Sequence, residues 1–295
     1  MTLRHGQAVA LMVAITAMWS IAGVVTRHLE SARSFEITFW RSFFTVVSLL
    51  LILPLMQGRG VFRRVPWRSP YFWSSGLCWS VMFTAFMLAL TLTSVANVLV
   101  TMAIGPLVTA LMTRVALKHR LPPRTWGAIV LAGLGIGWMF GQQLQVGAPG
   151  FLAGAMVALC VPLAGGVQWT LVQKAQQQGL ALDLVPSVML GALISSALTI
   201  APAWPMQASA HDIGLLALLG LVQLAIPCAL SVVVARVLKA PEVSLLALLE
   251  VVFGIALAWL GAGEAPQPSV LLGGSMVIAA LVGNEWLGWR ERARG

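Results

Sequence analysis

The chain has 295 residues, of which 59% are hydrophobic and only 9% are charged, and its formal net charge is +9 at pH 7. Soluble domains carry about 25% charged residues, so this composition excludes a water-soluble globular protein. The basic residues form no continuous stripe and lie between apolar runs, which argues against a nucleic-acid partner. The composition instead indicates a protein that lies in a lipid bilayer.

The cysteines and the N-terminal segment exclude two further classes. Cys78, Cys160 and Cys228 lie within apolar segments, and their odd number argues against a disulfide framework. They belong to no metal or haem motif, so we expect small packing residues and neither a metal nor another cofactor. The stretch MTLRHGQAVALMVAITAMWSIAGVV is too long for the apolar core of a signal peptide, so we expect it to remain as the first transmembrane helix.

Long apolar runs separated by polar, proline-containing breaks predict ten transmembrane helices. About 20 apolar residues cross the roughly 30 Å hydrocarbon core of a bilayer. Ten such helices leave roughly 95 residues for loops and tails, about what short connections need. The expected spans are 8–26, 37–56, 71–90, 95–116, 125–141, 150–172, 184–203, 213–235, 243–262 and 270–288.

The Lys and Arg residues predict the orientation of these spans. With the N-terminus in the cytoplasm, fifteen of the eighteen Lys and Arg residues lie in cytoplasmic segments. The exceptions are Arg27, Arg33 and Arg41. Because cytoplasmic loops of membrane proteins carry an excess of basic residues, this distribution predicts ten spans with both termini in the cytoplasm.

The two halves of the chain resemble each other. IGPLVTALMTRVALKHRLPP, from Ile104, aligns with LEVVFGIALAWLGAGEAPQP, from Leu249. Each half has five expected spans, an odd number, so the second copy would lie inverted in the bilayer, as is typical of secondary transporters. The sequence therefore predicts an all-α integral membrane protein built from two inverted five-helix repeats, residues 1–146 and 147–295.

The repeated segment also resembles a known family. ALTLTSVANVLVTMAIGPLVTALMTRVALKHRLPPRTWGAIVLAGLGIGWM and its counterpart from Ala235 to Val282 are similar to the paired EamA-type modules of the drug/metabolite transporter superfamily. MWSIAG and FWRSFF, on the first two expected spans, also resemble that family's pattern. The resemblance covers nearly the whole chain and implies a ten-helix exporter. Among characterised members, the sequence most resembles the YddG-type exporters of aromatic and other amino acids.

Two positions depart from the pattern of that family. Lys118-His119 stands where such modules commonly have Gly-Glu, whereas the second copy keeps Gly263-Glu264. Val251 stands where a proline often follows the glutamate. The resemblance therefore does not by itself fix the details of the substrate site.

An ionisable residue, Glu250, lies near the middle of the ninth expected span. A charged side chain at the centre of a span costs about 2.5–3.5 kcal/mol, so an acid there is expected to face protein or water and to be neutral when unpaired. Ala247, Gly254, Ala258 and Gly261 share its helical stripe, and small residues allow close packing or leave room for a cavity. Glu250 is a candidate to bind a substrate ammonium group or a proton; the alternative is a structural hydrogen bond.

Further candidates lie on four other spans and combine hydroxyls, bare backbone, an amide, a proline and aromatic rings. Packing is the alternative for each, because hydroxyls often bond to their own helix, a kink can lack a ligand and aromatic rings often pack or face lipid. The other candidate cavity residues are Trp19, Ser20, Trp79, Phe83, Thr101, Gly105, Gln168 and Trp169, with Pro162 as a helix kink.

Arg41 is expected at the outer rim, in the first turn of the second span. Arg27, Glu30, Arg33 and Glu36 precede it, so this rim would hold a mixture of acidic and basic side chains. Solvated charge is the default interpretation. The alternative is a latch of ion pairs that forms when the exit closes, although exposed pairs contribute only about 0–1 kcal/mol.

These features predict a secondary transporter that exports small organic solutes, such as aromatic and other amino acids, by alternating access across an inner membrane of bacterial type. No Walker A motif occurs, so ATP drive is not encoded in this chain. The alternative is an exporter of drugs, cationic toxicants or other metabolites. The expected partners are a small-molecule substrate and the lipid bilayer; the sequence predicts neither the substrate list, the coupling ion, the direction of flux nor the oligomeric state.

Two other classes of function are disfavoured. An intramembrane enzyme would need paired acids, a nucleophile with its base, or metal ligands within the spans. No HExxH or GxSxG motif is present, and the four histidines lie in tails, loops or span ends. The internal duplication and the acid within a span argue against a non-transporting scaffold protein.

Overall fold

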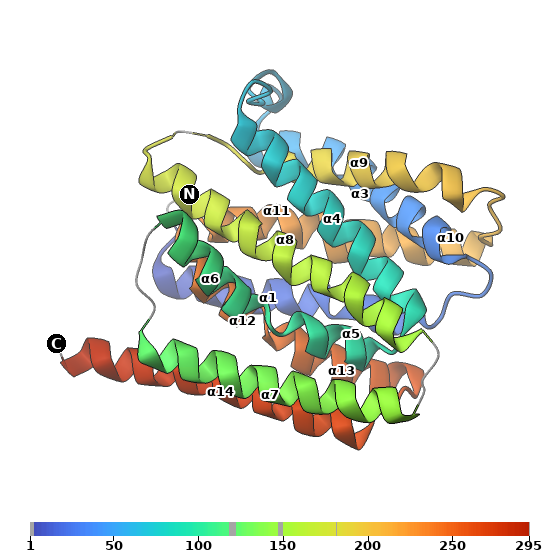
Figure 1. Ribbon diagram of the computed structural model, residues 1–295. Coiled ribbons are helices and arrows are strands. Elements are labelled where there is room, and N and C mark those ends of the chain that lie inside the picture. The colour runs from blue at the N-terminus through green and yellow to red at the C-terminus, as the bar shows by residue number, and fades with distance from the viewer. Residues whose placement is uncertain (1–2, 118–121, 147–149, 181, 295) are drawn as a thin grey trace.

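The structure is a computed structural model that describes residues 3–117, 122–146, 150–180 and 182–294. Within these ranges every regular element is a helix, and no strand occurs. The helices lie side by side in one bundle (Figure 1). The predicted all-α class is therefore confirmed, while Lys118 and His119 lie outside the described residues.

Six of the membrane-length segments are continuous α-helices. Four of them begin at a proline. Proline has no N–H group, and this costs nothing in the first turn of a helix, where N–H groups find no acceptor within the helix. A short 3-10 helix, η1 (Val61–Arg63), lies in the loop between α3 and α4. The continuous helices are α3 (Ser34–Gln57), α4 (Pro70–Leu92), α7 (Pro123–Val146), α8 (Phe151–Gln177), α9 (Pro186–Ala203) and α14 (Pro268–Arg294).

The remaining segments are interrupted within the bundle. Three of them consist of two α-helices in succession, and a fourth contains a π-helical segment, η2, between two α-helices. The interrupted segments are α1 (His5–Trp19) with α2 (Ile21–Thr26), α5 (Val95–Met102) with α6 (Gly105–Leu117), α10 (Ala210–Leu218) with η2 (Leu219–Ala225) and α11 (Ile226–Val234), and α12 (Ala240–Leu246) with α13 (Leu249–Ala262).

Nine stretches of the described residues are helical, apolar and long enough to cross a membrane. They coincide with nine of the ten expected spans. The expected span 125–141 falls on α7, whose apolar stretch, Trp126–Gly135, is shorter. In Figure 1, α1 begins and α14 ends at the same end of the bundle, on the left. The tenth span, the inverted repeat and the cytoplasmic termini stay predictions.

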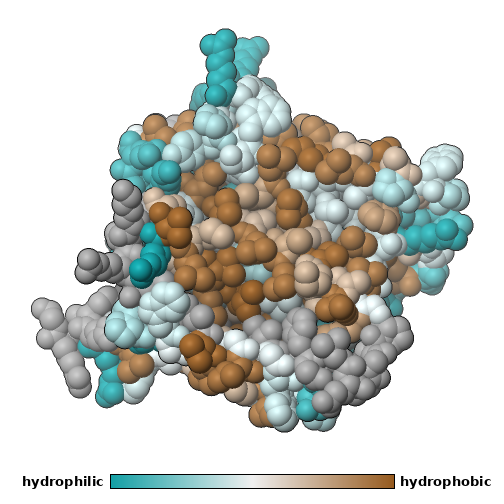
Figure 2. All heavy atoms as spheres, viewed as in Figure 1, coloured by the Kyte–Doolittle hydropathy of each residue, from teal (hydrophilic) through white to brown (hydrophobic). Residues whose placement is uncertain are grey.

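The surface of the bundle is apolar over much of its area. Leu51, Leu55, Val115 and Leu260 are 67%, 86%, 78% and 84% exposed. Figure 2 shows hydrophobic side chains across the middle of one face and hydrophilic ones at its ends and on a projection at the top. Apolar surface of this extent marks contact with a membrane or a partner. This apolar surface and the apolar helices together indicate a multi-pass membrane protein.

The most extensive helix contacts join the first half of the chain to the second half. α4 packs against α8 and α9, α3 packs against α9, α7 against α14, and α6 against both α8 and α12. Glycines allow the close approach: a Cβ atom on Gly76 would lie 2.6 Å from Leu190, and one on Gly191 would lie 2.3 Å from the Cβ atom of Trp79. The halves therefore interdigitate, and the division at residue 146 stays a prediction about the repeat.

Candidate functional site

Two helix interruptions fall at matching positions of the repeated sequence. The break between α5 and α6 is at residues 103–104, and the break between α12 and α13 is at residues 247–248. When Ile104 is aligned with Leu249, these breaks agree to within one residue. In the first copy Pro106, which has no N–H group, stands in the first turn of α6. Backbone hydrogen bonds continue across the second break, where the N–H groups of Glu250 and Val251 donate to the carbonyls of Ala247 and Leu248 at 3.0 Å.

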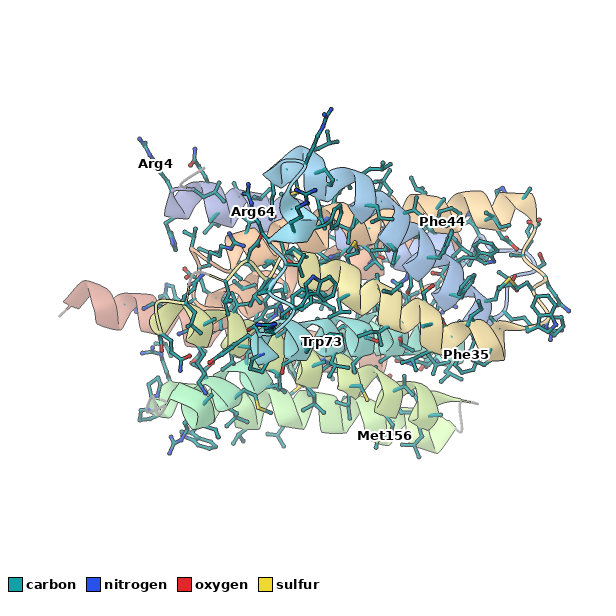
Figure 3. All side chains as sticks on the ribbon, turned by 90° about the horizontal axis from the view of Figure 1, so that it is seen from above. Arg4, Phe35, Phe44, Arg64, Trp73 and Met156 are labelled. Carbon is teal, nitrogen blue, oxygen red and sulfur yellow. The ribbon has the colours of Figure 1, made fainter. Side chains whose placement is uncertain are left out.

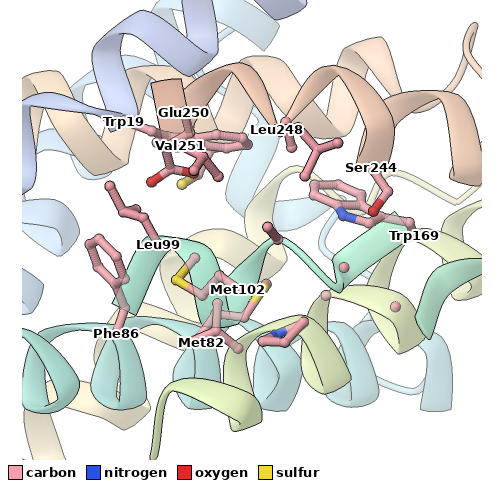
Figure 4. A pocket seen from close by; sticks show the side chains of 18 of the residues that line it. Trp19, Met82, Phe86, Leu99, Met102, Trp169, Ser244, Leu248, Glu250 and Val251 are labelled. Atoms are coloured by element: carbon pink, nitrogen blue, oxygen red, sulfur yellow. The ribbon is translucent and has the colours of Figure 1, made fainter. Parts of the chain in front are cut away.

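A cavity of about 130 Å³ lies between these breaks. One water molecule needs roughly 10–15 Å³ measured in this way, so the cavity has room for a larger group. Its lining comes from both halves of the chain and is mostly apolar. In Figure 4, Glu250 and Trp19 lie towards one end of this space and Trp169 and Ser244 towards the other.

The cavity lining includes most of the residues that the sequence predicted. It brings together side chains from α1, α4, α8 and α13 with the first residue of α6. These predicted residues are Trp19, Trp79, Phe83, Gly105, Pro162, Trp169 and Glu250. Pro162 lies inside α8, which continues through it as one helix, so the interruptions occur elsewhere than at the expected kink.

Three predicted residues lie outside the cavity lining. The Ser20 hydroxyl donates to the carbonyl of Ala17 at 2.7 Å, and the Thr101 hydroxyl donates to the carbonyl of Asn97 at 2.7 Å. Both hydroxyls therefore bond to their own helix, which was the alternative for such groups. Gln168 is fully buried, and neither polar atom of its side chain has a hydrogen-bond partner among the described residues.

The prediction that Arg41 lies at the outer rim is wrong. Arg41 is fully buried on α3 and lines the cavity. Its Nη1 donates to Gln223 Oε1 at 3.1 Å, and its Nη2 donates to the carbonyl of Phe83 at 2.6 Å. α3 begins at Ser34, so Arg41 lies two turns inside the helix. There its guanidinium donates hydrogen bonds to neutral acceptors on η2 and α4.

The Arg41 guanidinium keeps unused hydrogen-bonding capacity. No partner within the described residues reaches its Nε. The ion pairs found among those residues involve His5, Arg27 and Arg236, so no described carboxylate neutralises Arg41. A buried cation held only by neutral groups is costly, and such groups mark candidate binding sites for anions.

Glu250 lies in the first turn of α13, where the helix dipole favours negative charge. Its side chain extends from α13 beside Trp19, towards the space bordered by Leu99 and Phe86 (Figure 4). Among the described residues, no ion pair reaches its carboxyl group. The second charged side chain of the cavity therefore also lacks a partner of opposite charge among the described residues.

The small residues near Glu250 pack helices closely. A Cβ atom on Gly254 would lie 2.5 Å from Leu99 Cδ1, and one on Gly261 would lie 2.6 Å from Val24 Cγ2. α13 is therefore pressed against α5 and α2 along this stripe. The close packing holds Glu250 towards the cavity rather than towards lipid.

Aromatic rings form one wall of the cavity. The ring centroids of Trp79 and Phe83 are 5.5 Å apart, and those of Trp79 and Trp169 are 5.8 Å apart at an interplanar angle of 85°. All three side chains are buried, and the most exposed of them, Trp169, is 7% exposed. The Trp79 Nε1 has no hydrogen-bond partner within the described part of the chain. The wall thus offers flat apolar surface and one free donor.

The sequence reasoning missed several residues of the lining. The most informative is Gln223, which holds Arg41 and stands as a lone amide in the apolar stretch LGLVQLA. That isolated amide was the available signal, since an unpaired amide is costly in lipid. Ser244 accepts a hydrogen bond from the Thr109 hydroxyl at 3.1 Å across the two interrupted segments. The other lining residues that were missed include Met82, Phe86, Met102 and Cys228.

Asp212, a charged group outside the cavity, is held by several hydrogen bonds to the protein. Asp212, at the start of α10, accepts hydrogen bonds from the backbone N–H groups of Glu30, Ser31 and Ala32 at 2.8, 3.0 and 2.9 Å. Its carboxylate also accepts from the Ser31 hydroxyl at 2.9 Å. No group of three or more His, Cys, Asp and Glu residues in the described ranges could hold a metal ion.

Two further carboxylates near this end of the bundle are also bonded. Glu36 is fully buried and accepts from the backbone N–H groups of Gln207 and Ala208 at 2.9 and 2.8 Å. Glu264 pairs with Arg27 at 2.6 Å and accepts from the N–H group of Val95 at 2.7 Å. These acids join the loops that connect the helices.

The first half of the chain is similar to a known family. Residues 6–141 match the model of the EamA-like transporter family. Over these residues the chain is similar to that family. The EamA-like match covers α1 to α6 and most of α7, and so includes Trp19, Arg41, Trp79 and Gly105 of the cavity. An EamA-like protein is a membrane transporter of small solutes.

Comparison with solved structures supports the fold over the whole chain. A structure described only as "Crystal structure of protein" is 17% identical and covers 97% of this chain and 98% of its own, with a TM-score of 0.66. In all, 23 chains of solved structures match. No curated protein matches this sequence. The structural likeness therefore extends through both halves, including α8 to α14.

Proposed function

We propose that this EamA-like protein is a secondary transporter that exports small zwitterionic solutes, aromatic and other amino acids among them, across the inner membrane by alternating access. The observation that carries the proposal is the pair of charged side chains in one cavity. Arg41 and Glu250 both line it, and neither has an oppositely charged partner among the described residues. A transporter of small solutes needs such a site within the bilayer.

The charges of the cavity match those of an amino acid. A guanidinium binds a carboxylate through charge-assisted hydrogen bonds, and the Nε of Arg41 is available for one. An ionised Glu250 would bind the ammonium group of the same solute. A zwitterion brings no net charge into the bilayer and neutralises both side chains at once, so both desolvation costs are offset by one ligand.

The aromatic wall supports a preference for apolar or aromatic side chains. Trp79, Phe83 and Trp169 provide flat apolar surface, and edge-to-face or stacked ring contacts contribute about 0.5–1.5 kcal/mol beyond the burial of area. The lining residues Met82 and Met102 can adapt to side chains of different shape. This combination favours a panel of related amino acids over one solute.

The arrangement of the breaks supports alternating access. Interrupted helices at the interface of repeats hold substrates in secondary transporters. The α5–α6 and α12–α13 breaks belong to different halves and border the same cavity. Rocking of one predicted repeat against the other would expose this cavity to each side in turn. Facilitated diffusion and proton coupling both fit this cycle.

The alternative function is export of organic cations, such as drugs. The unpaired Glu250 beside Trp19 favours it, because a carboxylate and an aromatic ring attract cations. Arg41 counts against it, since a cation in this small cavity would be repelled by the buried guanidinium. The two functions differ in the need for a carboxylate on the solute.

Counterflow in proteoliposomes tests the proposal. Vesicles are loaded with phenylalanine or leucine, and three analogues compete for the exchange. N-acetylphenylalanine lacks the ammonium group, phenylalanine amide lacks the carboxylate, and a tetraalkylammonium ion is a simple organic cation. We expect exchange of the intact amino acids and weak competition by the three analogues. Strong exchange of phenylalanine amide and the tetraalkylammonium ion without exchange of amino acids would replace the proposal with cation export.

A further inference from the structure

The loop between α3 and α4, residues 58–69, concentrates positive charge on the surface. It carries four exposed arginines: Arg59, Arg63, Arg64 and Arg68. The sequence contains no Asp or Glu between Glu36 and Asp183, so no acidic residue is near these arginines in the chain. Within the described residues, no ion pair reaches any of them. We call this segment the arginine loop.

The arginine loop has a defined fold. Gly58, with φ 85°, ends α3, and η1 follows through a hydrogen bond of 3.1 Å from the N–H group of Val61 to the carbonyl of Gly58. Val61 and Val65 are 3% and 7% exposed and pack in the same apolar core as Leu49 and Leu53. The apolar residues anchor the loop, so the guanidinium groups are displayed on an ordered backbone.

Two exposed tryptophans adjoin the arginines. Trp67 and Trp73 are 51% and 45% exposed, and the Nε1 of Trp73 donates to the carbonyl of Trp67 at 2.8 Å. Their ring centroids are 6.4 Å apart. Tryptophan is enriched at the boundary between the hydrocarbon core and the headgroups of a bilayer. These rings therefore place the arginine loop at headgroup depth.

The loop projects sideways from the bundle. In Figure 1 the segment between α3 and α4 rises above the neighbouring helices, and in Figure 2 the same projection carries hydrophilic side chains above an apolar surface. Figure 3 shows Arg64 and Arg4 towards the end of the bundle opposite Phe35. A sideways projection at headgroup depth lies over the surrounding lipid rather than over the protein.

We propose that the arginine loop binds the headgroups of anionic phospholipids. Guanidinium groups form bidentate hydrogen bonds with phosphate, and lipid phosphates lie at the depth that the tryptophans indicate. Each basic residue near an anionic bilayer surface strengthens binding by about fivefold. The inference is independent of the transported solute, because the loop contributes no residue to the cavity.

The test measures the lipid preference of the reconstituted full chain. The protein is placed in phosphatidylcholine vesicles with trace spin-labelled phosphatidylglycerol or spin-labelled phosphatidylcholine, and the immobilised fraction of each label is recorded. We expect selective immobilisation of the anionic label. In the variant with Arg59→Gln, Arg63→Gln, Arg64→Gln and Arg68→Gln, the selectivity should fall by about tenfold or more.

Two matched variants separate charge from folding. Replacing the same four arginines with lysine should keep most of the selectivity, and Arg33→Gln, an exposed arginine outside the loop, should keep all of it. Equal selectivity in the wild type and the glutamine variant overturns the proposal. So does displacement of the anionic label by glycerol phosphate in solution, because the loop would then bind free phosphate.

Discussion

The charged groups of the cavity and those at the end where α10 begins differ in how completely the protein hydrogen-bonds them. Asp212 accepts hydrogen bonds from three backbone N–H groups between Glu30 and Ala32, and Glu36 accepts from two more. By contrast, the Nε of Arg41 has no hydrogen-bond partner in the described chain, and no ion pair there reaches Glu250. Both regions are buried or partly buried, yet only the cavity leaves its charged side chains incompletely bonded to the described protein.

This contrast separates structural charge from charge that is available to a ligand. A carboxylate that accepts several backbone hydrogen bonds stabilises the loops that donate them. A buried charge without such bonds destabilises the fold unless something else compensates it. The loops of the first region can therefore be expected to depend on their acids for stability, and the cavity to depend on its charges for transport.

The largest expected effect is loss of stability in Asp212→Ala. The substitution leaves three backbone N–H groups and the Ser31 hydroxyl without their acceptor, and breaking such a network costs about 3–5 kcal/mol. Unfolding in detergent, followed by circular dichroism, measures the change. Asp212→Asn, which keeps an oxygen acceptor, should lose less. Equal stability of both variants and the wild type would show that these hydrogen bonds are dispensable.

Arg41→Gln should have the largest effect on transport. The amide carries no charge for a solute carboxylate, so exchange of phenylalanine should fall by about thirtyfold or more. Counterflow at saturating and limiting solute measures it. Arg41→Lys is the control that keeps the charge and removes the planar fork. Unchanged exchange in Arg41→Gln would assign Arg41 to packing alone.

Glu250→Gln should reduce transport less, by about tenfold. The amide has nearly the same shape, so insertion and folding should be retained while the charge that attracts ammonium is lost. The measurement is amino acid exchange across a range of pH values, with Glu264→Gln as a matched substitution on a carboxylate outside the cavity. Rates that equal those of the wild type at every pH would remove Glu250 from the mechanism.

The smallest expected effect is on selectivity. Trp19→Ala and Trp169→Ala should each change the ratio of phenylalanine to leucine exchange by about fivefold, the range that ring contacts supply. Competition counterflow gives the ratio directly. Trp67→Ala, which removes an exposed tryptophan outside the cavity, is the control. A ratio that stays constant in both cavity variants would contradict a substrate-contacting wall.

The patterns that the sequence predicted best are those that follow from local chemistry. Helix positions were predictable because lipid requires about 20 apolar residues in each span. Glu250 was predictable as a cavity residue because an acid within a span cannot face lipid without cost. Trp19, Trp79 and Trp169 were assigned to the cavity on weaker grounds, since aromatic spacing alone does not distinguish a wall from packing.

The burial of Arg41 could not be read from its neighbours in sequence. Several charged residues precede it and suggest a solvated rim, whereas its acceptors, Gln223 and the carbonyl of Phe83, lie 182 and 42 residues away. The positions of the helix breaks could not be read from the prolines either. Pro162 predicted a kink in α8, but the break between α12 and α13 has no proline at residues 247–248.

The sequence by itself determined a membrane protein of apolar helices in which one acid faces the interior of the bundle. It could do so because the cost of exposing charge or free backbone to lipid acts on each segment separately. Only the tertiary structure decided which polar groups meet. It brought Arg41, Gln223 and Glu250 to one cavity and saturated Asp212 and Glu36 elsewhere. Those partners come from distant segments, and packing of one helix against another sets their distances.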